Sequence, residues 1–267
     1  MKIAFIGGGN MGEAILAALL NKKLAKPGDI TVADVSKERL DFLKKQYKVS
    51  VTSLNTEAIA GKEIVLLAIK PQALSNVMAG LKGSLKPNQL VLSIIAGATI
   101  SKIGQGLAHK AIVRSMPNTP ARFGYGMTGW MATPEVTGAQ KESARAILGA
   151  MGKEIYFDDE KYIDMVTAVS GSGPAYFFLL AESLTEAALK IGLGQKESEE
   201  MVVQTMLGAA QLSAQSGQSP ATLRQNVTSK GGTTEAALKV FESADFRGIA
   251  AKAVRAAFER ARELGNG

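Results

Sequence analysis

Two patterns of apolar and polar positions divide the chain. In the first part, short apolar runs are bounded by polar or glycine positions, which is typical of strands buried on both faces of a parallel sheet. Helical patterns separate these runs, so the first part predicts β–α alternation around one sheet. The predicted strands are residues 3–6, 30–35, 63–69, 90–95, 111–115, 126–131 and 153–157.

From about Glu160 onward the pattern is helical throughout. These helices are rich in Ala and Gly and carry broad apolar stripes, which a lone domain of this size cannot bury by itself. Burial between subunits is the simpler explanation. We therefore predict an α/β fold in which an N-terminal domain of Rossmann type, residues 1–158, is followed by an all-α dimerisation domain, residues 159–267.

The first predicted strand runs directly into a glycine turn and a helix. Gly7, Gly9 and Gly12 have the G-x-G-x-x-G spacing, which supplies a tight turn, backbone approach to a pyrophosphate and close packing of helix on strand. The start of the helix offers unpaired N–H groups to the phosphates. Because strand and helix both flank the motif, it favours a dinucleotide site over a purely structural turn.

The end of the second strand bears on the choice of coenzyme. Asp34 stands where an acid accepts hydrogen bonds from the ribose 2′-hydroxyl of NAD. Ser36, Lys37 and Arg39 could instead hold the 2′-phosphate of NADP if Asp34 turns away, or they could simply begin a capped helix. The residues alone therefore predict NADP(H) or NAD(H) and leave the preference open.

Two further strand ends and one later loop are candidate site segments. Lys70-Pro71 and Ala96-Gly97 follow apolar strands, and ligands of open α/β sheets sit at such carboxyl ends, although Lys70 could equally be an ordinary strand-end charge. The loop Asn226–Thr234 is polar and glycine-rich and stands immediately before a helix. Free N–H groups there could bind a carboxylate, or the loop could be a flexible capped helix start. The expected donors are Ser229, Gly231, Gly232 and Thr233, with the Thr234 hydroxyl beside them.

Composition narrows the class of protein. Apolar residues make up 46% and charged residues 21%, which describes a soluble globular chain without a membrane-length apolar run. The first strand begins within two residues and leaves no room for a signal peptide, and the chain has no cysteine, so we expect a cytoplasmic protein. The net charge of +7 is spread along the chain, which favours anionic metabolites over nucleic acid.

Sequence patterns of hydrolytic or metal-dependent catalysis are missing. The chain has one histidine, His109, in a polar stretch where we expect a solvated side chain, and no H-E-x-x-H, G-x-S-x-G or P-loop pattern. We predict no metal site. Hydride transfer fits this absence, because the coenzyme carries the difficult chemistry and the protein mainly orients two ligands.

Five stretches, in the same order and spread over the full chain, make the sequence resemble the pyrroline-5-carboxylate reductase family. They are Ile6–Gly12, Ala68–Gln72, Met116–Pro120, Ser170–Tyr176 and Leu223–Leu238. The resemblance implies reduction of 1-pyrroline-5-carboxylate to L-proline. It implies coenzyme contacts at Ala68, Lys70 and Pro71, with Asn55 near the adenosine ribose. The glycine turn and the other strand ends already predict contacts at Gly7, Gly9, Asn10, Met11, Gly12, Asp34, Ser36, Ala96 and Gly97. The resemblance implies that Val227 to Thr234 hold the substrate, and we expect Thr234 to be the catalytic residue, with its hydroxyl hydrogen-bonded to the ring nitrogen.

The resemblance also implies an interleaved homodimer, often gathered into a decamer, and a usual preference for NADPH. Asp34-Val35 departs from the Asn-Arg or small polar residue that many members have there, which affects the expected coenzyme preference. Two alternatives stay open. One is a β-hydroxyacid dehydrogenase or another imine reductase. The dehydrogenase would be expected to place a catalytic lysine on the first long helix of the second domain, whose first lysine here is Lys190. The other is a non-catalytic nucleotide-sensing regulator.

Overall fold

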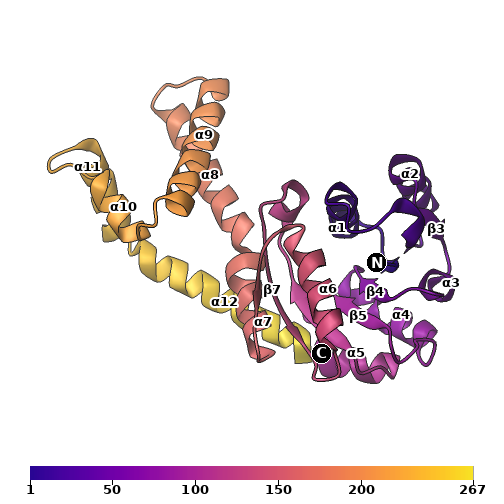
Figure 1. Cartoon of the computed structure of the whole chain (residues 1–267). Coiled ribbons are helices and arrows are strands. Elements are labelled where there is room, and N and C mark those ends of the chain that lie inside the picture. Colours follow the sequence, from indigo (N-terminus) through magenta and orange to yellow (C-terminus); the bar gives the residue numbers. More distant parts are fainter. Residues whose placement is uncertain (267) are drawn as a thin grey trace. The chain divides into compact units, whose positions relative to one another are not determined.

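The computed structural model describes residues 1–266. In it, the strands between Ile3 and Tyr156 form one eight-stranded sheet (Figure 1). The strand order is β3-β2-β1-β4-β5-β6-β7-β8, and neighbours run parallel except for the antiparallel pair β6 and β7. The strands are β1 Ile3–Ile6, β2 Ile30–Ala33, β3 Ser50–Thr52, β4 Ile64–Leu67, β5 Leu90–Ser93, β6 Ile112–Met116, β7 Gly126–Ala132 and β8 Gly152–Tyr156.

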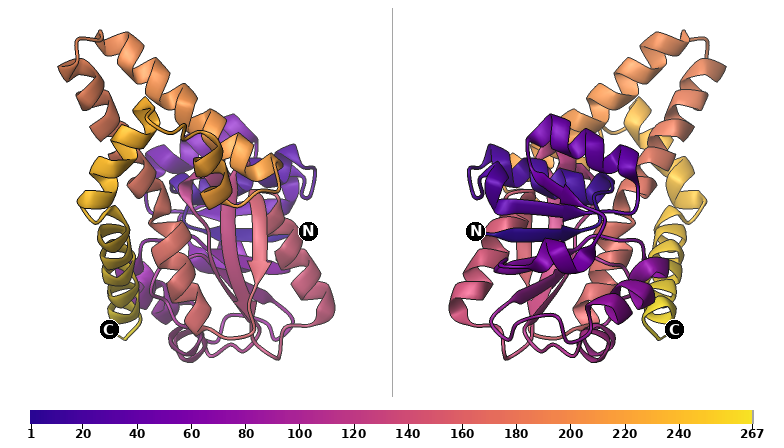
Figure 2. Two further views of the ribbon diagram at one scale, coloured as in Figure 1. Left: turned by 90° about the vertical axis from the view of Figure 1, so that its left-hand side faces the viewer. Right: turned by 90° about the vertical axis from the view of Figure 1, so that its right-hand side faces the viewer.

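Helices cover both faces of this sheet and enclose two apolar clusters (Figure 2). One cluster joins the sheet to α1 Asn10–Asn21, α2 Lys37–Tyr47 and α6 Gly138–Gly149. The other joins it to α3 Asn55–Ile59, α4 Leu74–Leu81 and α5 Ile100–Leu107. The central strands β1, β4 and β5 are buried at every position, which explains their uninterrupted apolar runs. The doubly wound α/β domain predicted from the sequence is thus confirmed.

Strand β3 is the element that the sequence pattern missed. It has three residues, lies at the sheet edge and pairs only with β2 among the described strands. None of its residues is buried, so it lacks the apolar run by which the other strands were recognised. Short edge strands need little apolar surface because one side faces no neighbour.

The chain divides into two compact units, and the division differs from the boundary expected at residue 158. The sheet unit comprises Met1–Ser172 together with the segment from Ala257 onward, and the helical unit comprises Gly173–Ala256. Helix α7, Lys161–Val166, belongs to the sheet unit because the buried Arg114 of β6 bonds to Glu160 at 2.7 Å and to Asp164 at 2.6 Å. The end of the last helix belongs there too, since Leu264 packs against Gly97.

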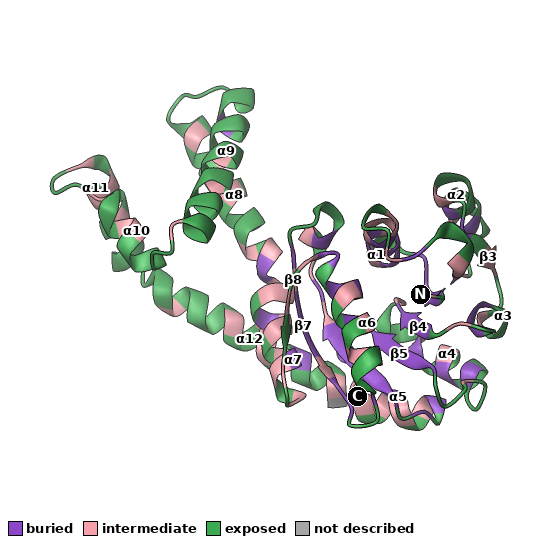
Figure 3. Ribbon diagram, viewed as in Figure 1, coloured by how far each residue is buried: buried purple, intermediate pink, exposed green. Residues whose placement is uncertain are grey.

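The helical unit contains long helices joined by short loops. Within it, the side chain of Ser219 caps α10 by accepting the Thr222 N–H at 3.1 Å, and Pro220 is the first residue of that helix. Almost all of the unit is exposed, whereas burial concentrates in the sheet (Figure 3). The helices are α8 Gly173–Lys190, α9 Gln195–Gln215, α10 Pro220–Asn226, α11 Thr233–Ser243 and most of α12 Phe246–Asn266.

The expectation of a solvated His109 was wrong. Its side chain is buried, and Nε2 lies 2.7 Å from the carbonyl oxygen of Gln89. The Gln89 amide in turn donates to the carbonyls of Ile59 and Lys62. The polar neighbours of His109 in the sequence concealed this position, because the side chain is covered by residues distant in the chain. Its place in a structural network gives no role in proton transfer.

One continuous helical stretch of the described residues, Lys161–Lys190, is long and apolar enough to cross a membrane by length and composition, with a mean hydropathy of 1.2. Only 17% of the most apolar 18-residue segment of this stretch is buried in the single chain. Apolar surface of this kind requires cover, which a membrane or another protein surface can supply.

Candidate active site

Each glycine of the turn after β1 has its own steric reason. Gly7 has φ +102°, and a Cβ there would lie 2.5 Å from the carbonyl oxygen of Ala68. A Cβ at Gly12 would lie 2.6 Å from the carbonyl oxygen of Gly7, so helix α1 approaches the strand closely. At Gly9 a Cβ would meet nothing within 4 Å, which leaves the backbone open to a ligand. These are the three roles that the G-x-G-x-x-G spacing predicts.

The first turn of α1 supplies hydrogen-bond donors at the same place. The Glu13 N–H donates to the Gly9 carbonyl at 2.8 Å and closes the first helical turn. The preceding amides of Asn10, Met11 and Gly12 therefore have no acceptor within the helix. Free N–H groups and the positive end of the helix dipole suit a pyrophosphate, so the residues present fit a dinucleotide.

Asp34 lies beside the glycine turn and binds its backbone. Its Oδ2 accepts the Gly8 N–H at 2.7 Å, and its Oδ1 accepts the Ser36 N–H at 3.0 Å. Ser36 caps α2, since its hydroxyl accepts the Arg39 N–H at 3.1 Å and donates to Glu38 at 2.9 Å. The capping interpretation of Ser36 is thus confirmed, and the structure resolves the direction of Asp34, which faces the turn.

Arg39 is held within a second network under the turn. Its Nε donates to the Gly8 carbonyl and its NH2 group to Glu13, which also accepts the Tyr47 hydroxyl at 2.7 Å. Burial works to raise the pKa of Glu13, but the hydrogen bonds from Arg39 and Tyr47 outweigh it and lower that pKa. Burial and the hydrogen bond to Glu13 raise the pKa of Tyr47 to about 12. The network therefore holds a carboxylate, a guanidinium and a neutral phenol.

The other candidate coenzyme residues follow neighbouring strands. Ala68, Lys70 and Pro71 come after β4, and Ala96 and Gly97 come after the adjacent β5. Lys70 is exposed, and Pro71 opens a short 3₁₀ helix. Gly97 has φ +72° and is buried, and a Cβ there would lie 2.7 Å from Cβ of Leu264. Its glycine is thus required for packing against the last helix, whether or not its backbone contacts a ligand. Asn55 is the first residue of α3, after the edge strand.

The loop between α10 and α11 and the first turn of α11 belong to the helical unit, and together they contain all candidate substrate residues. Two of the four expected free donors are engaged: the Gly231 N–H donates to the Glu235 carboxylate at 2.8 Å, and the Gly232 N–H to the Ser229 carbonyl at 3.0 Å. The loop folds back tightly at Gly231, with φ +73°, and this brings the Glu235 side chain within reach. Val227 is exposed.

Free donors remain in this loop, at a slightly different place. Among the described residues, the N–H groups of Ser229, Thr233, Thr234 and Glu235 have no acceptor. The Thr234 side chain is partly buried and its hydroxyl makes no hydrogen bond within that part of the chain. The start of α11 thus offers three consecutive amides and one hydroxyl.

Family models match both parts of the sequence. Residues 160–264 match "Pyrroline-5-carboxylate reductase dimerisation", and residues 2–97 match "NADP oxidoreductase coenzyme F420-dependent". The pyrroline-5-carboxylate reductase of Pseudomonas aeruginosa is 41% identical, over 98% of this chain and 96% of its own.

Among solved structures, a pyrroline-5-carboxylate reductase from Coxiella burnetii superposes with a TM-score of 0.90 at 42% identity, covering 98% of both chains. The Plasmodium falciparum pyrroline carboxylate reductase, solved with NADP bound, has a TM-score of 0.89 at 31% identity, covering 99% of this chain and 98% of its own. The chain belongs to the pyrroline-5-carboxylate reductase family.

Two of the family-like stretches are joined by a side chain that sequence reasoning did not single out. Asn118 donates from Nδ2 to the carbonyl and hydroxyl oxygens of Ser170, each at 3.2 Å, and its Oδ1 accepts the Met127 N–H at 2.9 Å. Ser170 lies in a π-helical turn, Thr167–Gly171, just before α8. Asn118 thus holds the π-helical turn that precedes α8, inside the region 160–264 that matches the family's dimerisation model. The only sequence signal for it was the family-like motif itself.

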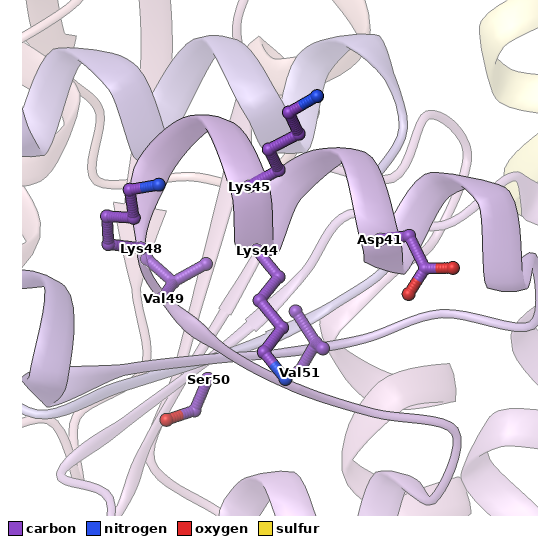
Figure 4. A pocket seen from close by; sticks show the side chains of 7 residues that line it. All are labelled: Asp41, Lys44, Lys45, Lys48, Val49, Ser50 and Val51. Carbon is purple, nitrogen blue, oxygen red and sulfur yellow. The ribbon is translucent and has the colours of Figure 1, made fainter.

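One hollow in the sheet unit lies away from these residues. It is lined by Asp41, Val49, Ser50, Val51 and three lysines of α2 and its C-cap, Lys44, Lys45 and Lys48 (Figure 4). It lies where β3 begins, whereas the glycine turn follows the carboxyl end of β1. The lysine side chains are solvated, and no candidate coenzyme residue of this family member lines the hollow.

Proposed function

We propose that this chain reduces 1-pyrroline-5-carboxylate to L-proline with NADPH or NADH. One observation carries the proposal: the start of α11 has three consecutive amides without an acceptor next to the free hydroxyl of Thr234, in one of the stretches that resemble the family. The glycine turn supplies the coenzyme half of the reaction. The names of the relatives, at about 40% identity over the full chain, support the same substrate.

The substrate carboxylate rests on the amides of Thr233, Thr234 and Glu235. A helix start supplies donors and a positive dipole end without a basic side chain. The engaged Gly231 and Gly232 amides shape the turn instead of binding the anion. Ser229, whose amide is free, and Val227, which is exposed, are the remaining loop residues that can contact the substrate.

Thr234 contacts the ring nitrogen. A cyclic imine is basic enough to be protonated near neutral pH, and the iminium accepts hydride more readily than the neutral imine. A hydroxyl can both donate and accept a hydrogen bond, so it can hold the nitrogen in either protonation state. Positioning the ring in this way supplies most of what the protein must contribute, because orientation removes the entropy of bringing two reactants together.

The bound coenzyme supplies the hydride. Gly7, Gly9 and the amides of Asn10 to Gly12 hold its pyrophosphate, while Asp34, Ser36 and Asn55 lie toward the adenosine ribose. The residues after β4 and β5 border its nicotinamide end: Ala68, Lys70, Pro71, Ala96 and Gly97. This assignment follows the rule that ligands of open α/β sheets bind at the carboxyl ends of the strands.

The functional protein is a homodimer at least, and decamers built from such dimers are the expected larger assembly. The helical unit has an apolar groove lined by residues of four helices, including Leu180, Leu238, Phe241 and Phe246. It has a second apolar surface on the exposed face of α8. A second copy covers these surfaces, which removes the need for a membrane. The absence of cysteine and the biosynthetic reaction fit the cytoplasm.

A spectrophotometric assay tests the proposal. The purified protein is mixed with NADPH or NADH and 1-pyrroline-5-carboxylate, and loss of the reduced nicotinamide absorbance is followed together with formation of proline. We expect proline in equal amount to the coenzyme oxidised. Coenzyme binding without turnover would support a nucleotide-sensing regulator, and turnover only with other imines or with hydroxyacids would support a related reductase or dehydrogenase.

A further inference from the structure

Gly8, the middle glycine of the turn, is held from both sides. Its N–H donates to Asp34 Oδ2 at 2.7 Å, and its carbonyl accepts a hydrogen bond from Arg39 Nε. Asp34 is held a second time by the Ser36 N–H at 3.0 Å. The carboxylate therefore cannot turn away from the ribose end of the site without leaving two amides unpaired, one of them on the buried Gly8.

Arg39 has its partners beneath the turn. Its guanidinium forms an ion pair with Glu13, whose side chain is only 17% exposed and is also bound by Tyr47. The guanidinium carbon lies 5.0 Å from the centroid of the Phe42 ring, a cation–π distance. Moving Arg39 outward to a phosphate would abandon these contacts and leave the Glu13 carboxylate with one partner fewer.

The charges that remain near the ribose end do not favour a phosphate. Lys37 is an exposed cation with no ion pair among the described residues, but Asp34 and the exposed carboxylate of Glu38 lie on either side of it in the sequence. A 2′-phosphate would bring further negative charge to this place, whereas a 2′-hydroxyl can donate a hydrogen bond to Asp34.

We infer that this chain binds NADH in preference to NADPH, with Asp34 as the residue that discriminates and Arg39 as a positioning residue of the glycine turn. The inference rests on the proposed coenzyme site. A fixed carboxylate at the ribose end of the site weakens binding of the phosphorylated coenzyme by about tenfold or more, as for like charges at a partly exposed site. Added salt narrows this difference because it screens the repulsion.

Binding to the full-length protein tests the inference without turnover. Dissociation constants are measured by calorimetry for NADH and NADPH, and for the fragments 5′-ADP and 2′,5′-ADP, which differ in the 2′-phosphate. We expect tighter binding of NADH and of 5′-ADP. A dissociation constant for NADPH equal to or below that for NADH would overturn the inference while leaving the proposed reaction intact. Failure of all four ligands to bind would instead contradict the proposed coenzyme site.

Two variants separate the roles of Asp34 and Arg39. Asp34→Asn keeps a carbonyl acceptor for Gly8 but removes the charge, so the affinity ratio should move toward NADPH by about tenfold. Arg39→Ala should weaken both coenzymes by a common factor, because it loosens the turn that both share. A selective loss of NADPH in Arg39→Ala would show a phosphate ligand and overturn this part, as would an unchanged ratio in Asp34→Asn.

Lys44→Ala serves as the matched control. Lys44 is an exposed lysine of the same helix, α2, and its removal changes the net charge as Arg39→Ala does. It should leave both dissociation constants unchanged, so an equal shift there would assign the effect to general charge and contradict the local roles. Melting temperatures of all variants identify any loss of fold, and Arg39→Lys, which can still pair with Glu13, replaces Arg39→Ala if the latter unfolds.

Discussion

The sheet unit buries many of its large apolar side chains, whereas the helical unit leaves its own at least partly exposed. In the sheet unit Phe5, Leu66 and Leu92 are fully buried, each at 0% exposure. Among the described residues of Gly173–Ala256 no apolar side chain is buried, and Phe178 and Ile191 are 62% and 82% exposed. A sheet with helices on both faces closes its own core within one chain, whereas these helices cannot.

Because of this difference, the helical unit depends more on association than the sheet unit does. Burial of apolar surface stabilises a protein by about 25 cal/mol for each Å², and surface left exposed lacks this stabilisation. Residues 160–264 match the family's dimerisation model, so we expect the helical unit to bury this surface against another copy and its apparent stability to depend on protein concentration. The sheet unit has no such requirement, and the candidate coenzyme residues lie there.

We expect the largest effect from Phe178→Asp on helix α8. Phe178 stands among four consecutive exposed apolar residues, 177–180, and a carboxylate buried there between subunits costs several kcal/mol. The variant should fail to form the dimer, lose helical signal in circular dichroism and be inactive.

Ser183→Asp, at an exposed polar position of the same helix, is the control with the same charge and should assemble normally. Light scattering over a dilution series measures the mass. A folded, fully active wild-type species of 28.0 kDa would contradict the dependence of the helical unit on association.

Arg114→Ala should have the next largest effect, within the sheet unit. Arg114 is 2% exposed and pairs with both Glu160 and Asp164, so its loss leaves two partly buried carboxylates without their cation. Breaking a buried pair in this way typically costs about 3–5 kcal/mol of unfolding free energy. Urea unfolding at fixed protein concentration measures it.

The exposed pair of Arg224 and Glu242 in the helical unit, 3.2 Å apart, provides the comparison. In a single chain Arg224→Ala should cost about 1 kcal/mol or less. A larger loss, present only at concentrations where the dimer forms, would indicate that the second copy covers this side of the apolar groove. A loss below about 1 kcal/mol in Arg114→Ala would show that the sheet unit does not need its buried ion pairs.

A third pair of variants separates substrate chemistry from coenzyme affinity. Thr234→Ala should lower turnover by about a hundredfold or less, the lower end for a placed acid–base group, and leave coenzyme affinity unchanged. Gly9→Val should instead lower coenzyme affinity and leave turnover nearly unchanged. The backbone φ of −64° at Gly9 accepts a side chain, and the valine side chain would fill the space that is open to the pyrophosphate. Steady-state kinetics and calorimetry measure the two effects. Full turnover in Thr234→Ala would remove the hydroxyl from the mechanism.

The smallest expected effect concerns acid stability. Because the folded-state pKa of Glu13 lies below its usual 4.5, the charged carboxylate stabilises the fold above that pH. This contribution is lost as the pH falls through the lowered folded-state pKa. In Glu13→Gln the melting temperature should therefore lie below that of the wild type at neutral pH and approach it in acid. If the difference in melting temperature between the variant and the wild type is the same at all pH values, the ionised pair with Arg39 adds no stability.

Much of the fold follows from local patterns in the sequence. The apolar runs at β1, β4 and β5, the glycine spacing after β1 and the Ser-Pro cap of α10 each involve residues close together in the chain. Their physical causes, strand burial, backbone freedom and helix capping, act over a few residues. The order of the elements, the dinucleotide turn and the need for a second copy could therefore be predicted.

Side-chain directions could not be read in this way, because they depend on groups distant in the sequence. Whether Asp34 faces the turn depends on Gly8, 26 residues earlier, and whether Arg39 is free depends on Glu13. The buried positions of His109 and Arg114 likewise rest on packing by other elements. Local pattern predicts which residues surround the site. Which of their charges are left to meet a ligand follows only from the tertiary structure, because it depends on long-range hydrogen bonds.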